Sequence, residues 1–196
     1  MKKLNLIVLA ALVALFNVAF AQDGDMEGQA AMKAWMDAGT PGPQHAELAK
    51  HVGEWDCVVK MWMDPSQPPM ESKGTETIEM IFGGRIQVGH FTGDFMGMPF
   101  HGQSMTGYSN FAKVWWGTWI DDMSTALMYS EGTSSDDGKT VTFFGTMDDP
   151  ASHVMDKTIK QIMKRIDDDH FIFESWDNAK TPQEYKSMEI SYTRKK

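Results

Sequence analysis

The chain has 196 residues with 18 Lys and Arg, 27 Asp and Glu, and a formal net charge of −9. This length predicts one main domain, and the 42% apolar and 23% charged residues exclude a largely disordered chain. The acidic balance without a Lys/Arg block argues against nucleic acid as a partner, because phosphate neutralisation needs clustered cations. The single cysteine, Cys57, excludes an intramolecular disulfide.

Residues 1–21 have the pattern of a secretory signal. Lys2 and Lys3 precede an unbroken apolar run at 6–16, and the segment ends in Ala-Phe-Ala at 19–21, which fits the cleavage rule. A run this short, at about 1.5 Å per residue, cannot cross a hydrocarbon core about 30 Å thick. We therefore predict a cleaved, exported chain that does not insert into a membrane. The expected compartment is the periplasm, with secretion as the alternative.

The next segment, residues 22–43, is predicted to form an N-terminal helix followed by a hinge. Good helix formers dominate residues 28–37. Pro41 and Pro43 then interrupt the helix, because a proline fixes its own φ and biases the preceding residue to extended geometry. A second short helix is expected over residues 45–51.

Residues 44–196 are predicted to form one β-rich domain. Its segments with strand character are separated by turn signals such as Asp136-Asp137-Gly138, because Asp-Gly tolerates the positive φ of a type I′ turn. Connections this short force neighbouring strands to be antiparallel, and closing the sheet into a barrel removes its exposed edges. The predicted strands are 52–63, 71–82, 85–95, 100–109, 113–120, 124–133, 139–147, 156–166, 170–176 and 184–194.

The predicted fold class is therefore all-β, as a single antiparallel up-and-down barrel of about ten strands with a short N-terminal helix. A membrane-spanning barrel would need an uninterrupted apolar outer face. Charged side chains inside the predicted strands argue against that kind of barrel. These are Lys60, Glu76, Glu79, Lys160, Lys164 and Glu189.

A G-x-W motif, Gly53-Glu54-Trp55, opens the first predicted strand, and Arg194 ends the last one. This arrangement resembles the lipocalin-like (calycin) barrels, in which a basic side chain from the final strand lies over the tryptophan. The resemblance implies that Trp55 closes one end of the barrel and that the Arg194 guanidinium stacks on its ring.

A closer resemblance covers nearly the whole predicted β-domain. The segments HAELAKHVGEWD, GDFMGMPFHGQSMTGYSN, TWIDDMSTALMYSEGT and MEISYTR follow one another in the order and spacing of the Domain of Unknown Function family 1579. One departure is Ser109, where an Asp is expected, so no carboxylate role carries over at this position. The family has no established activity, so the resemblance implies the fold and supplies no catalytic residue.

Several side chains of the predicted strands point to a small-molecule pocket. Trp115 and Trp119 share one face of their strand, and aromatic walls with a few polar groups are typical of such pockets. Tyr108 and Arg85 are the candidate orienting groups, and Met61 is a further lining residue. The main hypothesis is a non-catalytic binding protein for a small, largely apolar molecule held in the barrel. The alternative for the tryptophans is an ordinary core.

The methionines and histidines raise a second hypothesis. Met61-x-Met63 and Met96-x-Met98 offer thioethers with His90 and His101 not far off in sequence, and soft ligands of this kind favour Cu(I). Haem bound through His90 is the other cofactor considered, since His90 alternates with apolar residues that face the interior in the predicted register. The competing interpretation is that methionine fills irregular interiors and plastic surfaces.

Catalysis has little support in the sequence. No G-x-S-x-G, H-E-x-x-H or Walker motif is present. Glu174 shares a face with Ile172 and Trp176, which would make it a buried carboxylate, and Cys57 is predicted to be a buried, unreactive thiol. The paired aspartates fall at predicted turns without the spacing of a calcium loop. An enzyme is therefore not the expected class.

A third hypothesis is an interaction protein whose own side chains fill the barrel. Residues 95–100 would form an exposed Met/Phe loop that docks a partner, and the partner considered includes a second copy in a homodimer. The hypothesis predicts no ligand and a mass that depends on protein concentration.

Overall fold

The computed structural model describes residues 26–135 and 138–196. The predicted signal at residues 1–21 lies outside this range, as does part of the Asp-Asp-Gly turn at 136–138. Helix α2 (Met26–Gly39) matches the predicted helix and, up to Ala38, belongs to a unit separate from Gly39–Lys196. Its side chains are mostly exposed. Within the described residues, no helix is both long and apolar enough to cross a membrane.

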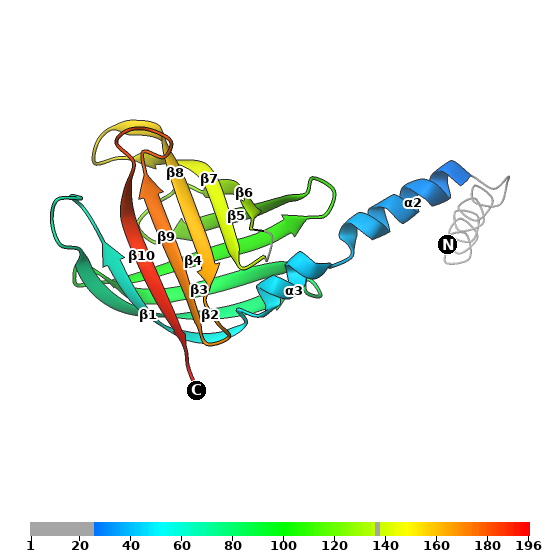
Figure 1. The fold of residues 1–196 in the computed structure, drawn as a ribbon, viewed down its shortest axis with the longest axis horizontal. Coiled ribbons are helices and arrows are strands. Elements are labelled where there is room, and N and C mark those ends of the chain that lie inside the picture. The colour runs from blue at the N-terminus through cyan, green and yellow to red at the C-terminus, as the bar shows by residue number, and fades with distance from the viewer. Residues whose placement is uncertain (1–25, 136–137) are drawn as a thin grey trace, which may run out of the picture. The chain divides into compact units, whose positions relative to one another are not determined.

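Ten antiparallel strands follow and close into a single barrel (Figure 1). Each strand pairs with its neighbour in the chain, and the last pairs with the first, from Trp55 opposite Arg194 to Met61 opposite Met188. The up-and-down barrel predicted from the sequence is confirmed. The strands are β1 (Gly53–Met61), β2 (Met70–Ile81), β3 (Ile86–Phe95), β4 (Met98–Ser109), β5 (Val114–Asp121), β6 (Met128–Ser134), β7 (Thr140–Asp149), β8 (Val154–Arg165), β9 (His170–Asp177) and β10 (Tyr185–Arg194).

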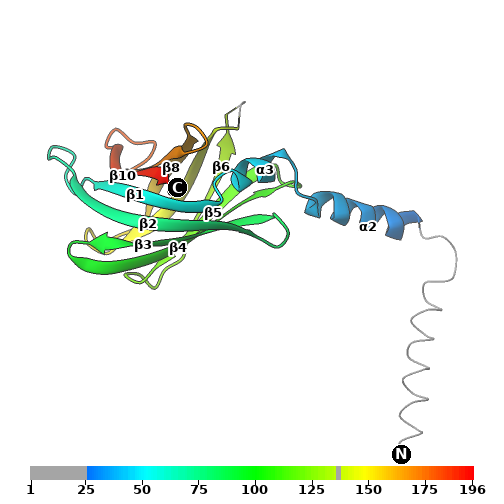
Figure 2. The same cartoon turned by 90° about the horizontal axis from the view of Figure 1, so that it is seen from below.

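Helix α3 (Pro43–Ala49) lies at the end of the barrel where β1 begins, which we call the helix end (Figures 1 and 2). Pro43 begins the helix, where the missing N–H costs no intrahelical hydrogen bond. Leu48 is buried against Trp115 and Phe143. The Gln87 side-chain amide donates to the Leu48 carbonyl at 2.9 Å, which fixes α3 on the barrel.

The opposite end of the barrel, which we call the loop end, carries the connections that leave odd-numbered strands. Because the strands alternate in direction, the connections at 62–69, 96–97, 122–127, 150–153 and 178–184 all lie there. Figure 1 shows several of them on the side away from α3. The two ends therefore differ: one carries a packed helix and the other only loops.

Side chains alternate between the inside and the outside of the barrel along each strand. The inward positions of β1 hold Trp55, Cys57 and Val59, all buried, while their neighbours Asp56 and Val58 are exposed. A connected buried cluster runs around the wall from these residues. It comprises Trp55, Cys57, Val59, Ile78, Phe91, Phe171, Ile190 and Tyr192.

Candidate functional site

Trp55 and Arg194 lie together at the helix end. Trp55 is 1% exposed, and its indole N–H donates to the His51 carbonyl at 2.8 Å. The Arg194 guanidinium lies 4.1 Å from the centre of the indole ring and donates to the carbonyls of Val52 and Lys50. This is the contact that the G-x-W resemblance implies, and it ties the last strand to the segment between α3 and β1.

The inward side chains of the loop half are not fully buried. Phe100, Trp119, Phe173 and Met188 point into the barrel and pack on the central cluster, yet each keeps partial exposure. The rings of Phe100 and Trp119 are stacked, with centroids 6.3 Å apart. Their partial exposure shows that solvent reaches these inward side chains in the loop half of the barrel.

Inward glycines let aromatic rings lie flat against the barrel wall. A Cβ on Gly74 would be 2.4 Å from the Phe91 ring, and one on Gly102 would be 2.2 Å from the Trp119 ring. Neither distance is compatible with a side chain. The rings of Phe91 and Trp119 therefore lie directly over the glycine backbone of the wall.

A buried carboxyl lies among these rings. Glu76 is 6% exposed and inward on β2, directly opposite Trp55 on one side and Phe91 on the other. The Tyr192 hydroxyl hydrogen-bonds to it, and the Ser104 hydroxyl donates to Oε1 at 3.5 Å. Burial raises the pKa of Glu76, and these two hydrogen bonds act against that rise.

Gly89 provides the space that the Glu76 carboxyl occupies. A Cβ at Gly89 would be 2.0 Å from Glu76 Oε1 and 2.6 Å from Ser104 Oγ. We expect Gly89→Ala to displace the carboxyl and to destabilise the protein by about 1–3 kcal/mol, the usual cost of overpacking. Chemical denaturation would measure the change. Gly117→Ala is the matched control, since the nearest atom to a Cβ there, Ser130 Oγ, is 3.4 Å away. Equal effects of both substitutions would contradict the expectation.

Several predicted lining residues do face the interior. Trp115 is buried against Leu48 at the helix end, where Tyr108 packs on it edge-on with centroids 5.3 Å apart. Trp119 lies in the loop half, and Met61 lies at the end of β1 opposite Met188. The structure therefore separates the two tryptophans: Trp115 packs under α3, and Trp119 is a partly buried side chain of the loop half.

Three predicted site residues do not face the barrel interior, and the inward position predicted for His90 was wrong. His90 is exposed on the outer face of β3, 3.8 Å from the Glu79 carboxylate, so it cannot hold a haem inside the barrel. Glu174 is on the outer face of β9, where it accepts from the Trp176 indole and pairs with Lys186. Arg85 lies exposed in the β2–β3 turn and donates to the Phe82 carbonyl.

The proposed soft-metal ligands are distributed along the rim of the loop end. β1 ends at Met61, so Met63 lies beyond the strand and is exposed, as are Met96 and Met98. His101 is also exposed there, with Nδ1 3.0 Å from the Asp122 carboxylate. Across the described residues, no group of three or more His, Cys, Asp or Glu side chains has the arrangement of a metal site.

Cys57 is a buried inward thiol whose pKa is raised by burial.

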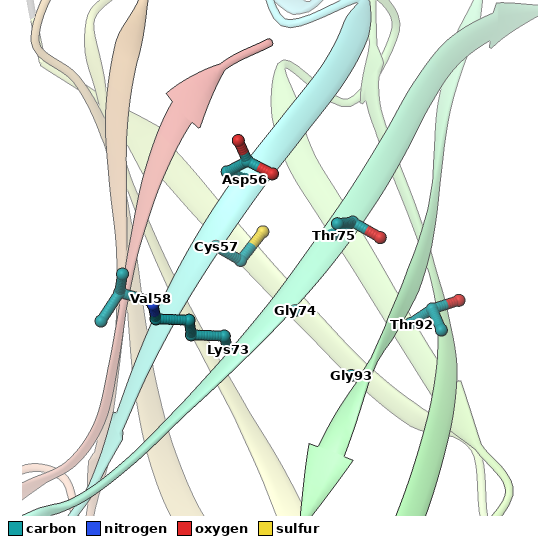
Figure 3. A pocket seen from close by; sticks show the side chains of 8 residues that line it. All are labelled: Asp56, Cys57, Val58, Lys73, Gly74, Thr75, Thr92 and Gly93. Carbon is teal, nitrogen blue, oxygen red and sulfur yellow. The ribbon is translucent and has the colours of Figure 1, made fainter.

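An open groove lies on the outer wall at this level, across β1, β2 and β3 (Figure 3). Its side chains Asp56, Lys73 and Thr92 belong to the outward set, and the floor is formed by glycine backbone. The Phe91 ring covers the inner side of this wall. Cys57 is also among the residues that line this groove.

Glu76 and its partners were not predicted as site residues. From the sequence, Glu76 counted only as a charge that argues against a membrane-spanning barrel. Its even spacing from Ile78 and Gly74 was the available signal, because alternation places all three on one face. Gln161, which accepts from the Ser130 hydroxyl at 3.1 Å, is a second buried polar contact that was missed.

These features define the class of the protein: a closed ten-stranded antiparallel barrel with a helix packed on one end and only loops at the other. The chain belongs to the family described as "Protein of unknown function (DUF1579)", which matches residues 40–194. The resemblance found in the sequence is thereby confirmed. The family description supplies no activity.

The fold also occurs among solved structures. The chain is similar to the crystal structure of Rv2717c from M. tuberculosis, with a TM-score of 0.57 and 11% identity over 80% of this chain and 100% of that one. At this identity the similarity supports the fold alone. A redesigned β-barrel matches with a TM-score of 0.41 and 10% identity, over 80% of this chain and 100% of that one. No curated protein matches the chain.

Proposed function

We propose that the protein is an exported, non-catalytic binding protein that holds a small, largely apolar molecule in the loop half of the barrel. The observation that carries this proposal is the partial exposure of inward side chains such as Phe100, Trp119 and Met188. When an apolar ligand covers apolar surface that is in contact with water, the free energy of the system falls, so such surface favours ligand binding.

The rim of the loop end supports the same proposal. Several exposed apolar side chains in one region are uncommon on soluble proteins, and such regions often are binding surfaces. Methionine suits such a rim because its flexible thioether side chain adapts to ligands of different shape. The exposed methionines in the loops and strand ends there are Met63, Met70, Met96, Met98, Met123 and Met155.

Native mass spectrometry of the protein purified from its own cell-envelope fraction tests the proposal. We expect a mass that exceeds the denatured mass by a few hundred daltons and a denatured mass that lacks residues 1–21. Loss of the excess on denaturation would identify a non-covalent ligand. An increment equal to one copper atom would support the soft-metal hypothesis instead.

The site within the barrel is tested by two tryptophan substitutions on the same strand. Trp119 faces the interior and Trp116 faces outward, where it lies on Gly107. We expect Trp119→Ala to retain much less of the co-purified ligand than the wild type, while Trp116→Ala retains the same amount. Unchanged retention in Trp119→Ala would place the ligand elsewhere.

The exposed methionines at the loop end also favour a second candidate, the docking of a partner protein. Met96 and Met98 lie within the predicted docking loop, residues 95–100, and both are exposed. In this case the native mass would show no bound small molecule. A mass that rises with protein concentration would point to a second copy as the partner.

A further inference from the structure

The buried Glu76 carboxyl lacks a positively charged partner within the described part of the chain. Among these residues it forms no ion pair, and the groups that act on it are its burial and two hydroxyls. The nearest titratable neighbours, Tyr192 and Cys57, are buried groups that carry no positive charge in any protonation state. Burial of a carboxyl without a cation is unfavourable, so such groups are usually paired or protonated.

Two hydroxyl groups contact the Glu76 carboxyl. The Tyr192 hydroxyl hydrogen-bonds to the carboxyl, and the Ser104 hydroxyl donates to Oε1 at 3.5 Å. Donors stabilise the ionised form of a carboxylate, and hydrogen bonds to charged groups are stronger than those between neutral groups. The site thus has the donors that a carboxylate needs and lacks the counter-charge.

The surroundings of Glu76 also suit a cation. Phe91 lies directly opposite it on β3, and Tyr192 stacks on Phe171 with centroids 3.9 Å apart. Aromatic faces attract organic cations, and the attraction is larger where water is excluded. Ser104, whose hydroxyl donates to the carboxyl, is only half buried, and Glu76 itself is 6% exposed. The net charge of −9 further favours the approach of cations over anions.

We propose that the barrel interior selects molecules that join an apolar body to one protonated amine, with the ammonium group paired to Glu76 and the apolar part against Phe100 and Trp119. This proposal rests on the proposed function, because it specifies the ligand class of the same interior. The ammonium would donate to the carboxylate beside the two hydroxyls and would complete its charge balance.

Three probes of equal chain length test the proposal with the wild-type protein: octylammonium, 1-octanol and octanoate at neutral pH. Isothermal titration calorimetry would measure their affinities. We expect octylammonium to bind at least tenfold more tightly than 1-octanol, and octanoate to bind most weakly. Equal binding of octylammonium and 1-octanol would overturn the amine proposal and leave the apolar binding site standing. Failure of all three probes to bind would overturn both proposals.

Glu76→Gln identifies the residue responsible, because it keeps the side-chain shape and removes the charge. We expect this variant to bind octylammonium and 1-octanol with similar affinity. Glu79→Gln is the matched control: it removes a charge from the same strand, on the exposed outer face. If both variants lose the preference equally, the preference comes from overall charge and the assignment to Glu76 is wrong. The three-probe ranking in the wild type decides the ligand class even if Glu76→Gln does not fold.

Discussion

Trp55→Ala is expected to destabilise the protein by about 3–5 kcal/mol, the usual cost of removing a fully buried large aromatic side chain. The indole packs edge-on against Phe171 at 4.7 Å between centroids, and its N–H donates to the His51 carbonyl. It also supports the Arg194 guanidinium. Removing the indole leaves a cavity at the helix end and removes the ring on which the Arg194 guanidinium of the last strand lies. Guanidinium denaturation followed by circular dichroism would measure the loss.

Trp116→Ala serves as the control for this substitution, since it removes the same side chain from the outer face, where the residue is only half buried. We expect its effect to be well below that of Trp55→Ala. Comparable losses would mean that burial at the helix end is not what makes Trp55 important. A lower midpoint with an unchanged denaturant slope in Trp55→Ala would show that the barrel still unfolds as one unit.

Acid is expected to destabilise the protein through His51. The ring is 3% exposed between α3 and the barrel, and Nε2 has no hydrogen-bond partner among the described residues. Burial lowers the pKa of His51 from its ordinary 6.5 to about 4. The unfolded chain therefore takes up a proton below pH 6.5, while the folded protein does so only near pH 4. Stability is present above pH 6.5 and falls as the pH falls through this window, by about 3 kcal/mol in total.

His51→Gln tests this pH dependence. The glutamine side chain does not titrate, so the difference in unfolding free energy between pH 7 and pH 4 should shrink by about 3 kcal/mol relative to the wild type. Comparison with the variant is needed because the raised pKa of Glu76 increases the stability of the folded protein as the pH falls, and this offsets part of the loss caused by His51. His101→Gln is the control, since His101 is exposed and should leave the profile unchanged. An unaltered profile in His51→Gln would show that another group carries the acid sensitivity.

The fold could be predicted because its determinants are local and repeat along the chain. Turn signals at short intervals exclude helical crossovers, so antiparallel pairing and closure follow from chain geometry. The resemblance of the G-x-W motif and Arg194 to lipocalin-like barrels implied one further contact, between Trp55 and Arg194. The strand limits differ from the predicted ones by a few residues, chiefly in β6, where residues 124–127 form the connection.

The prediction of which face points inward failed in strands that carry apolar residues on both faces. In β3, Ile86 and Val88 alternate with Gln87 and Phe91, and Gly89 contributes no apolar side chain to the inward set. Counting apolar residues therefore favoured the wrong face and placed His90 inside. The inward face of β3 is poor in side chains because Phe91 and Glu76 occupy the space over its glycines.

The same ambiguity misplaced Glu174 in β9. Ile172 and Trp176 share its face, but the structure buries Phe171 inward instead. Trp176 can remain outside because the Lys160 ammonium lies 4.4 Å from its ring centre and its indole N–H donates to Glu174. In the sequence alone, an outer tryptophan with such polar contacts cannot be distinguished from a tryptophan of the core.

The strand order, the antiparallel pairing and the closure of the barrel could be predicted from the sequence, because they depend on turn spacing along the chain, and the resemblance to lipocalin-like barrels implied the Trp55–Arg194 contact. Which face of each strand points inward, and with it the environment of Glu76, was visible only in the folded barrel. That environment combines residues from β1, β2, β3, β4 and β10, and a shift of one residue in any of these strands would turn its side chains to the other face, so no single segment encodes it.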